Sequence, residues 1–482
     1  MKLNSKQTRP IFHLVLLFSL LLASLSTGVA LRQEPASQRG SKQAKRALVI
    51  SIDGLDARYL LKRDEYGLKI PTLRRLMAEG LTAQGVRGVY PSVTYPSHTT
   101  IATGATPARH GIFGNEIVEP PDQPRTGAWH WFAREIKTDT LWDAAARNSL
   151  TTALISWPVA VGAGDYNVPE IFKVGGTRLE TLAVMSANAR PQGLLQEVAA
   201  HDPDLYKNVN ADESDDLRTR YAEYVIKEKR PGLLLIHLFD LDHFQHSFGP
   251  FTPEAFAILE KEDAYVARLL AAQERAGVMD ETAVFIVSDH GFLPITKLIH
   301  PGVLLARAGL IKVHEERDAQ GRAKEVVTEW RAMPYVTSGS CAIILRDAKD
   351  KEALKLARAA FADLMHVKAG GKLKENPLLG IVDANVLRRI GSNTDAAFML
   401  EATDGYAFGT NYTGEVVTPS KALGQHGYFP SRYAASFIAS GASVTRRGQL
   451  KEISMTDIGP TIARTLGLKL RDAEGQAIKI GQ

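Results

Sequence analysis

Short runs of consecutive apolar residues punctuate the first part of the chain, at 46–52, 151–157, 233–239 and 282–288. Runs of this length, rich in Leu, Ile and Val, are typical of strands that are buried on both faces of a parallel sheet. Between them lie segments of helical periodicity, at 71–80, 139–148, 215–229 and 253–276. The alternation predicts an α/β fold in which helices cover both faces of a mostly parallel central sheet.

Two of the helical segments carry further signals. The segment 71–80 has Pro71 at its start and Gly80 at its end, which mark the two boundaries of a helix. The segment 215–229 alternates acidic and basic residues and is predicted to face solvent.

The strand–helix rhythm stops between 301 and 420, where charged segments and shorter strand-like runs predominate. We predict a smaller, cap-like α+β subdomain inserted at 301–420. The rhythm resumes with a strand at 433–439 and a helix at 456–466, so the core predicted over 46–300 is completed by 421–482.

The N-terminus is predicted to be a signal peptide at 1–30, because three basic residues precede a leucine-rich run at 11–25 and small residues at 28–30. The apolar run is short for a membrane-spanning helix, and membrane attachment is expected only if this segment stays uncleaved. Residues 31–45 are polar and are predicted to be a linker.

Composition gives no reason to expect specific nucleic-acid binding, and the predicted signal peptide indicates an exported protein. Three units of the net charge of +5 come from the signal segment, which leaves +2 for the rest, too little to predict nucleic-acid binding. Cys341 is the only cysteine, so no internal disulfide can form, and we expect a bacterial periplasmic or secreted protein that relies on its core. Cys341 begins an apolar run and is predicted to be a buried, inert thiol.

Acidic and histidine side chains follow the predicted strands. The candidates are Asp53, Asp242 with His246, Asp289 with His290, and His426 in a glycine-flanked loop before the last strand. The carboxyl ends of parallel strands meet at one sheet edge, so these groups are expected to converge. Gathered carboxylates repel one another unless cations lie between them, and mixed Asp and His ligands suit zinc. Taken singly, each could be a turn or surface residue, as the Asp53-Gly54 pair illustrates.

Thr94 lies in a Pro-Ser-Val-Thr-Tyr-Pro segment that leads into a short helical pattern. Two interpretations are open for this residue. It is either the N-cap of the following helix or a nucleophile that a metal ion activates.

Several separated motifs share one family pattern: Asp53-Gly54, Thr94-Tyr95-Pro96-Ser97-His98, His110-Gly111-Ile112 leading to Asn115, Asp242 and His246 before Gly249-Pro250, Ser288 to Gly291, Gly424 to Gly427, and Thr456 to Thr461. Together they resemble the alkaline phosphatase superfamily and, within it, the nucleotide pyrophosphatase/phosphodiesterase (type I phosphodiesterase) family. The resemblance extends from about 45 to 468 and is weak over 301–420.

The resemblance implies an alkaline-phosphatase-like fold and two zinc ions. One ion would be bound by Asp242, His246 and His426, and the other by Asp53, Asp289, His290 and Thr94. Asn115 would donate to a phosphoryl oxygen, and the Tyr95 ring would either stack on the substrate or pack in the core. The implied activity is hydrolysis of phosphodiester or pyrophosphate bonds in small nucleotide-type substrates through a phospho-threonine intermediate.

Other functions remain to be weighed. A phosphomonoesterase or phosphonate hydrolase could use the same metal core, but no Arg or Lys lies between Thr94 and Pro107 to bind the extra phosphate charge. A sulfatase is disfavoured because Cys341 is not in a Cys-x-Pro-x-Arg segment. A non-catalytic metal- or phosphate-binding protein is the remote alternative. Val93 and Ser97 stand where many family members have Lys and Asn, which bears on substrate preference.

The remaining histidines near these motifs are expected not to bind metal. His237 is predicted to be a satisfied core residue, His243 to support a neighbouring ligand, and His98 to face the helix behind Thr94.

Overall fold

The computed structural model describes residues 43–124, 126–207, 214–317, 323–365 and 376–481. The predicted signal segment and most of the predicted linker lie outside these residues. Within them, none of the helices combines the length and the apolar character needed to cross a membrane.

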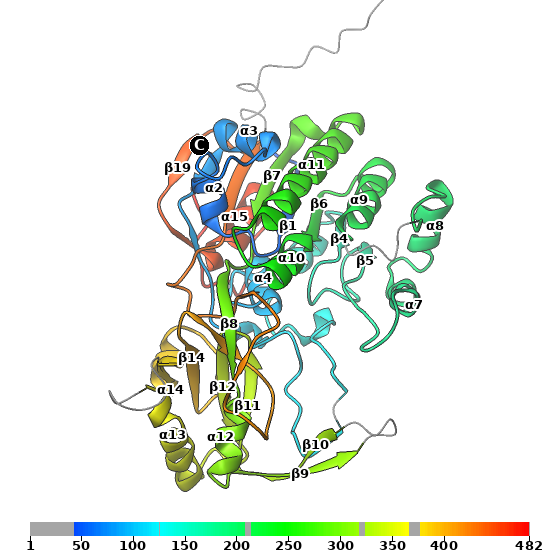
Figure 1. Ribbon diagram of the computed structural model, residues 1–482. Helices are drawn as coiled ribbons and strands as arrows, with labels where there is room; N and C mark the ends of the chain where they lie inside the picture. The colour runs from blue at the N-terminus through cyan, green and yellow to red at the C-terminus, as the bar shows by residue number, and fades with distance from the viewer. Residues whose placement is uncertain (1–42, 125, 208–213, 318–322, 366–375, 482) are drawn as a thin grey trace, which may run out of the picture. The chain divides into compact units, whose positions relative to one another are not determined.

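Eight of the described strands form the central sheet (Figure 1). From edge to edge they are β19 (Gly448–Leu450), β2 (Leu81–Ala83), β18 (Phe437–Gly441), β7 (Thr282–Val287), β1 (Arg46–Ile52), β6 (Leu233–Leu238), β4 (Thr152–Ile155) and β5 (Tyr166–Val168). Only β18 runs antiparallel to its neighbours β2 and β7. The mostly parallel sheet expected from the apolar runs is confirmed.

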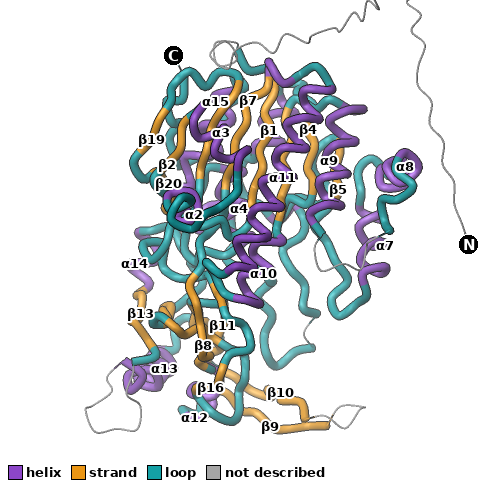
Figure 2. The backbone as a smooth tube through the Cα atoms, turned by 45° about the horizontal axis from the view of Figure 1, so that its top comes forward, coloured by secondary structure: helices purple, strands orange, loops and turns teal. Residues whose placement is uncertain are grey.

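Helices pack on both faces of this sheet because successive β1 residues point to opposite sides (Figure 2). Leu48 and Ile50 enter one core with helices α3 (Pro71–Glu79), α9 (Asp215–Lys229) and α11 (Pro253–Arg275). Val49 enters the other core with α4 (Thr94–Thr103), α6 (Leu141–Arg147) and α15 (Ile458–Thr465). Each strand is therefore covered twice, which explains why its sequence is apolar at consecutive positions.

The helix α9 has the predicted bounds, but the prediction that it faces solvent is wrong. Tyr221, Val225 and Ile226 are buried in the core beneath it, and Asp215, its first residue, is fully buried as well. The strand predicted at 433–439 begins only at Phe437. The preceding side chains bond to neighbouring loops instead: Ser436 donates to the carbonyl of Leu55 at 2.8 Å, and the hydroxyl of Tyr433 lies 2.7 Å from that of Ser92.

Smaller sheets are formed by the residues after β7. The strands β11 (Ala332–Thr337), β12 (Ser340–Leu345), β14 (Phe398–Ala402) and β13 (Leu378–Asp383) form an antiparallel sheet covered by α13 (Lys351–Met365). The strand β8 (Leu293–Ile299) pairs with β15 (Gly405–Phe408), β16 (Val417–Pro419) and β17 (Gly424–Gln425), and β9 (Ile311–Arg317) pairs with β10 (Ala323–Trp330). Cys341 is fully buried in this region and burial raises the pKa of its thiol, as expected of an inert residue.

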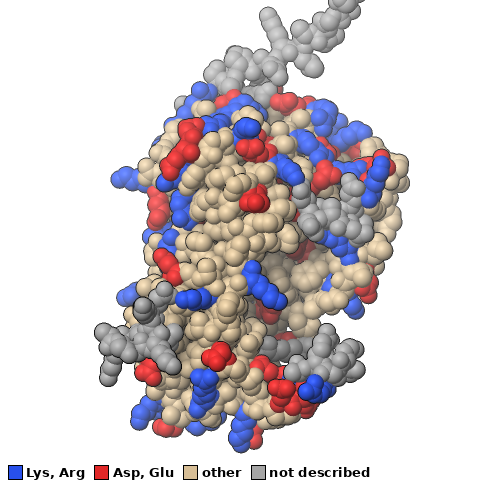
Figure 3. Space-filling model, viewed as in Figure 1, with Lys and Arg blue, Asp and Glu red and all other residues tan. Residues whose placement is uncertain are grey.

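The remaining elements are short or lie at the periphery. They are α2 (Ala57–Leu61), β3 (Val86–Arg87), α5 (Pro107–His110), α7 (Arg178–Asn188), α8 (Leu194–His201), α10 (Asp240–Phe248), α12 (Pro301–Arg307), α14 (Ala384–Arg389) and β20 (Ile453–Ser454). On the face of the molecule shown in Figure 3, acidic and basic side chains are interspersed.

Candidate active site

The carboxyl ends of three neighbouring parallel strands bring the predicted ligands together. In the register of the sheet, Ile52 of β1 lies beside Leu238 of β6, and Ser51 lies beside Val287 of β7. Asp53 follows β1, the helix α10 follows β6, and Asp289 comes two residues after the end of β7. The sheet edge therefore gathers side chains that are more than 180 residues apart in sequence, such as Asp53 and His237.

The first group consists of Asp242, His246 and His426. One potential ligand atom from each lies within 4.8 Å of the others. The α10 helix places Asp242 and His246 one turn apart, with His246 Nε2 3.4 Å from Asp242 Oδ2, and His426 Nε2 lies 3.6 Å from Asp242 Oδ1. Burial alone would raise the pKa of Asp242. The neighbouring histidines, His246 and His426 among them, outweigh this effect and lower the pKa to about 2.

The second group consists of Asp53, Asp289 and His290, all buried. His290 Nε2 lies 3.3 Å from Asp53 Oδ1 and 3.0 Å from Asp289 Oδ2. The imidazole rings of His290 and His426 stack with their centroids 3.8 Å apart, which makes the two groups direct neighbours. Two ions bound here would face a common substrate.

The donor atoms of both groups fit metal ions. Although His290 Nε2 and Asp289 Oδ2 lie close together, the following buried atoms form no hydrogen bond of acceptable geometry among the described residues: Asp53 Oδ1, Asp242 Oδ1, Asp289 Oδ2, His290 Nε2 and His426 Nδ1. Buried polar atoms in native proteins are normally satisfied, so this concentration calls for a partner of another kind. Burial, together with the Asp289 and Asp242 carboxylates, raises the pKa of Asp53 well above its usual value. Cations between these groups would remove that repulsion, and their Asp and His donors suit zinc.

Neighbouring groups orient these ligands. The Nδ1 of His246 lies 3.0 Å from the carbonyl oxygen of Gly424, which turns Nε2 toward the first group. Asp289 Oδ1 accepts the backbone N–H groups of Gly54 at 3.1 Å and of His290 at 3.0 Å. The other oxygen of Asp289 is thereby left for the second group.

The other histidines differ in their roles. His237 is buried and satisfied, as predicted, but its partner is Asp53: Nε2 lies 2.9 Å from Asp53 Oδ2. The sheet register contained this signal, because His237 is paired with Ser51, two residues before Asp53. His98 lies behind Thr94, with Nδ1 2.8 Å from the Thr94 carbonyl and Nε2 2.8 Å from Ser51 Oγ. His243 follows Asp242 in α10 and is exposed to solvent. The supporting role predicted for it is therefore wrong.

Thr94 is the first residue of α4 and not its N-cap. Val93 occupies the cap position and no side chain caps the helix. The cap interpretation is therefore wrong, and the hydroxyl is not used to satisfy the backbone of its own helix. Thr94 is 9% exposed and lines the cavity that also contains residues of both groups.

Asn115 and Tyr95 are held together next to Thr94. The backbone N–H of Tyr95 donates to Asn115 Oδ1 at 2.9 Å, which leaves the amide hydrogens of Asn115 for another acceptor. Tyr95 is 1% exposed, and its ring packs edge-on against Trp129 at 5.3 Å between centroids. Tyr95 thus belongs to a small core and also forms part of the cavity wall.

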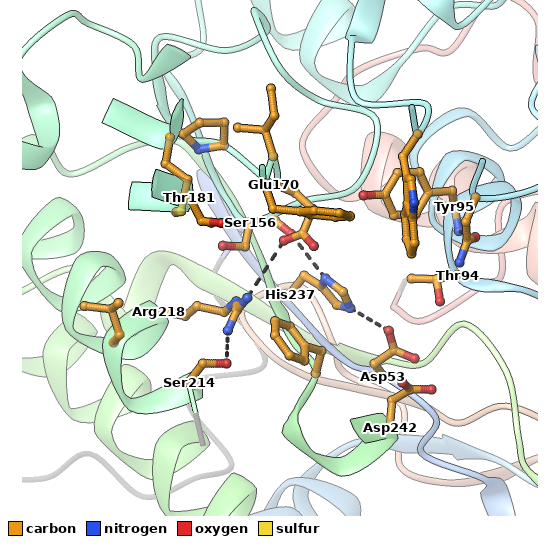
Figure 4. Close-up of a pocket in the computed structure, with 18 of the residues that line it drawn as sticks. Asp53, Thr94, Tyr95, Ser156, Glu170, Thr181, Ser214, Arg218, His237 and Asp242 are labelled. Atoms are coloured by element: carbon orange, nitrogen blue, oxygen red, sulfur yellow. Dashed lines mark hydrogen bonds and ion pairs between the residues drawn. The ribbon is translucent and has the colours of Figure 1, made fainter. Parts of the chain in front are cut away.

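The cavity has a volume of about 540 Å³ and extends well beyond Thr94 (Figure 4). Its lining also contains Trp129, Phe172, Leu182 and Met185, with Glu170, Arg178 and Arg218 as charged residues. The Arg218 guanidinium lies over the Phe239 ring at 3.7 Å and 3.9 Å from the Glu170 carboxylate. These wall residues were missed in the sequence because they belong to no motif and follow no periodic pattern.

His110 is buried behind the site, and its protonation makes the free energy of unfolding depend on pH. Its Nδ1 accepts the N–H of Ile112 at 3.2 Å, and its Nε2 lies 3.1 Å from Thr100 Oγ1. A proton on Nδ1 would point at the N–H of Ile112, so the protonated ring could not keep this hydrogen bond. Burial also disfavours the charged ring and lowers the pKa of His110 to about 3. The neutral ring is therefore the form compatible with the fold.

We expect the His110→Gln variant to lose less stability on acidification than the wild type. Between the unfolded pKa of about 6.5 and the folded value, the unfolded chain binds the extra proton, so stability falls as pH falls, by about 1.4 kcal/mol per pH unit for this residue. Urea unfolding at pH 7 and pH 5 should show about 2 kcal/mol less loss in the variant. Equal losses in the two proteins would contradict a neutral buried His110.

Comparisons with known proteins agree with this geometry. The family model described as "Type I phosphodiesterase / nucleotide pyrophosphatase" matches residues 47–429. Human ectonucleotide pyrophosphatase/phosphodiesterase family member 1 is 24% identical over 253 residues, which are 51% of this chain and 23% of that protein. Venom phosphodiesterase 2 of Crotalus adamanteus is 25% identical over 263 residues, 52% of this chain and 27% of that protein. The matched part thus spans less than a third of the length of either relative.

Solved structures share the fold. Murine ectonucleotide pyrophosphatase/phosphodiesterase 5 superposes with a TM-score of 0.61 at 18% identity, covering 89% of this chain and 97% of that one. An inactive threonine-to-alanine variant of the murine protein, in complex with AMP, superposes with a TM-score of 0.58 at 17% identity, over the same shares of the two chains.

Proposed function

Because this chain belongs to the type I phosphodiesterase / nucleotide pyrophosphatase family, we propose that it is a zinc-dependent hydrolase of phosphodiester or pyrophosphate bonds in nucleotide-type substrates, with Thr94 as the nucleophile. The observation that carries the proposal is a single cavity that Thr94 and Asn115 line together with all three residues of the first group and with Asp53 of the second. An exported location, periplasmic or secreted, is part of the proposal and rests on the N-terminal sequence alone.

The two groups would hold the zinc ions. Asp242, His246 and His426 would bind one ion, and Asp53, Asp289 and His290 would bind the other together with Thr94. Zinc in these sites supplies Lewis acidity, which acidifies the threonine hydroxyl and neutralises charge on the phosphoryl and leaving oxygens.

The residues of the chain carry the reaction itself. The Thr94 oxygen attacks phosphorus in line with the departing oxygen, so that a Thr94–phosphorus bond forms as the bond to the leaving group breaks. Asn115, whose carbonyl oxygen is held by the Tyr95 N–H, directs its amide hydrogens at a non-bridging phosphoryl oxygen. The N-terminus of α4 favours negative charge at this position. Water then attacks the phospho-threonine, and the Thr94 oxygen leaves.

The shape of the cavity supports a substrate with an organic group on each side of the phosphate. Its volume of about 540 Å³ is typical of small-molecule sites, and Trp129 and Phe172 offer flat apolar surfaces to a nucleobase. The Arg and Lys residues among the described lining residues are Arg178 and Arg218. In Figure 4, Arg218 lies across the cavity from Thr94 with His237 between them. A phosphate monoester, which carries one more charge, would call for a cation nearer to Thr94.

A paired assay tests the proposal. We expect bis-p-nitrophenyl phosphate to be hydrolysed with a kcat/KM at least roughly 10-fold higher than that for p-nitrophenyl phosphate. The reason is that the cations among the described lining residues are Arg178 and Arg218, and Arg218 lies across the cavity from Thr94. Chelation of metal should abolish both activities, and added zinc should restore them.

Preferred turnover of the monoester would refute the diesterase preference while leaving the metal core in place. Activity that persists after chelation would refute the zinc mechanism itself. Failure to hydrolyse either ester in the zinc-loaded protein would indicate a non-catalytic binding protein.

A further inference from the structure

A third group of buried carboxylates lies on the helices beside the cavity. Asp215 is the first residue of α9, Asp240 is the first residue of α10, and Glu262 lies near the middle of α11. One oxygen atom from each lies within 4.8 Å of the others, and all three residues are at most 2% exposed. The proposed reaction uses none of them.

Two of these carboxylates have a structural explanation. Asp215 Oδ2 accepts the backbone N–H of Asp240 at 2.7 Å, and Asp240 Oδ2 accepts that of Asp215 at 3.0 Å. Asp240 also accepts the N–H of Ser214. Each carboxylate therefore stabilises the N-terminus of the other helix, where negative charge is favoured. This exchange accounts for two charges and leaves the third unexplained.

Glu262 is the unexplained member. It is fully buried, and neither of its carboxylate oxygens receives a hydrogen bond from the described residues. Thr219, one turn after Asp215 on the same side of α9, is also fully buried with an unpartnered hydroxyl. Isolated buried carboxylates are very costly, so the oxygen atoms of Glu262 need a partner.

The surrounding charges define what that partner must be. The Arg218 guanidinium contacts Asp215 Oδ1 at 3.2 Å and is the cation that the ion pairs of the described residues bring to this group. Burial and the Asp215 carboxylate raise the pKa of Glu262, which shows how costly its charge is without a further cation. With all three groups ionised, three carboxylates beside one guanidinium leave two negative charges in a buried space. A divalent cation would neutralise them.

We propose that Asp215, Asp240 and Glu262 form a calcium site, separate from the catalytic metal groups. The donors are oxygen atoms only, which suits a hard cation and disfavours zinc. Both oxygens of Glu262 are available for bidentate binding, which is common in calcium sites. The ion would join the N-termini of α9 and α10 to α11, and so fix Arg218 and Phe239 in the cavity wall.

Calcium binding to the zinc-loaded protein tests the site. Wild type, Glu262→Gln and Glu254→Gln would be dialysed to equilibrium against radioactive calcium with zinc present throughout. Glu254 is an exposed residue of the same helix and serves as the matched control. We expect about one calcium ion per chain in wild type and Glu254→Gln and none in Glu262→Gln, because the amide cannot supply the charge. Calcium should raise the unfolding temperature of the first two proteins only.

Each other outcome overturns the proposal. In one, wild type binds no calcium while Glu262→Gln unfolds at the wild-type temperature. That result would mean that a proton shared between Glu262 and Asp215 satisfies the group, because the glutamine amide can donate the hydrogen bond that a protonated Glu262 would donate. Equal binding by wild type and Glu262→Gln would place the ion elsewhere. If Glu262→Gln does not fold, Glu262→Asp takes its place, because it keeps the charge but shortens the side chain. We expect this variant to bind calcium at least roughly 10-fold more weakly than wild type. Calcium affinity equal to that of wild type would refute the site.

Discussion

Replacement of Thr94 by alanine is expected to lower kcat/KM for bis-p-nitrophenyl phosphate by at least roughly 10³-fold, equivalent to about 4 kcal/mol of transition-state stabilisation. The side-chain oxygen is the atom that would bond to phosphorus, and Thr94 is the only Ser or Thr of α4 among the described residues that line the cavity. Because Thr94 borders that cavity and caps no helix, its loss should change the unfolding temperature little. Metal content should also stay near that of wild type, since each ion keeps its three Asp and His ligands.

The matched control is Thr94→Ser, which keeps the oxygen and is expected to retain covalent turnover. Rapid-quench experiments would detect phosphoprotein in wild type and Thr94→Ser, and none in Thr94→Ala. If Thr94→Ala kept a tenth or more of the wild-type activity, the attacking group would have to be something other than Thr94, such as water.

Removal of the metal ions should abolish activity and also lower the unfolding temperature. Without cations, the Asp53 carboxylate is buried and is repelled by the carboxylates of Asp289 and Asp242, and both effects raise its pKa. Each site held at about 10³ times its dissociation constant contributes about 4 kcal/mol to the free energy of unfolding. Differential scanning calorimetry of loaded, stripped and zinc-reconstituted protein would measure the loss and its recovery.

The Asp53→Asn variant distinguishes the repulsion between carboxylates in the metal-free protein from the loss of a metal ligand. Asp53→Asn removes one charge from the second group, so its stripped form should unfold at a higher temperature than stripped wild type, whereas its zinc-loaded form should be less stable than loaded wild type. Asp64→Asn, at an exposed ion pair with Arg74, is the control and should behave as wild type in both forms. If stripped Asp53→Asn were no more stable than stripped wild type, repulsion would not govern the metal-free state.

The ligand residues could be located from the sequence because of where they stand in the fold. Apolar runs that end in Asp53 and Asp289 identify strands, and parallel strands must present their carboxyl ends together. His426 was different: it follows the two-residue strand β17 and could be placed only by its motif. A register argument would have paired His237 with Ser51, but register depends on strand order, which apolar runs do not encode.

The cavity wall and the third carboxylate group could not be anticipated in the same way. Trp129 and Phe172 contact each other edge-on from separate loops, and such contacts depend on tertiary packing with no repeating pattern. Glu262 looked like one of several acidic residues on an amphipathic helix. Its burial follows from the way α11 packs on α9, which brings Glu262 beside Asp215.

The position of β18 has a consequence for truncated chains. This strand, at Phe437–Gly441, is inserted between β2 and β7, and His426 joins the first metal group from the segment just before it. A chain without these residues would therefore have β2 separated from β7 and would keep only two of the three residues of the first metal group.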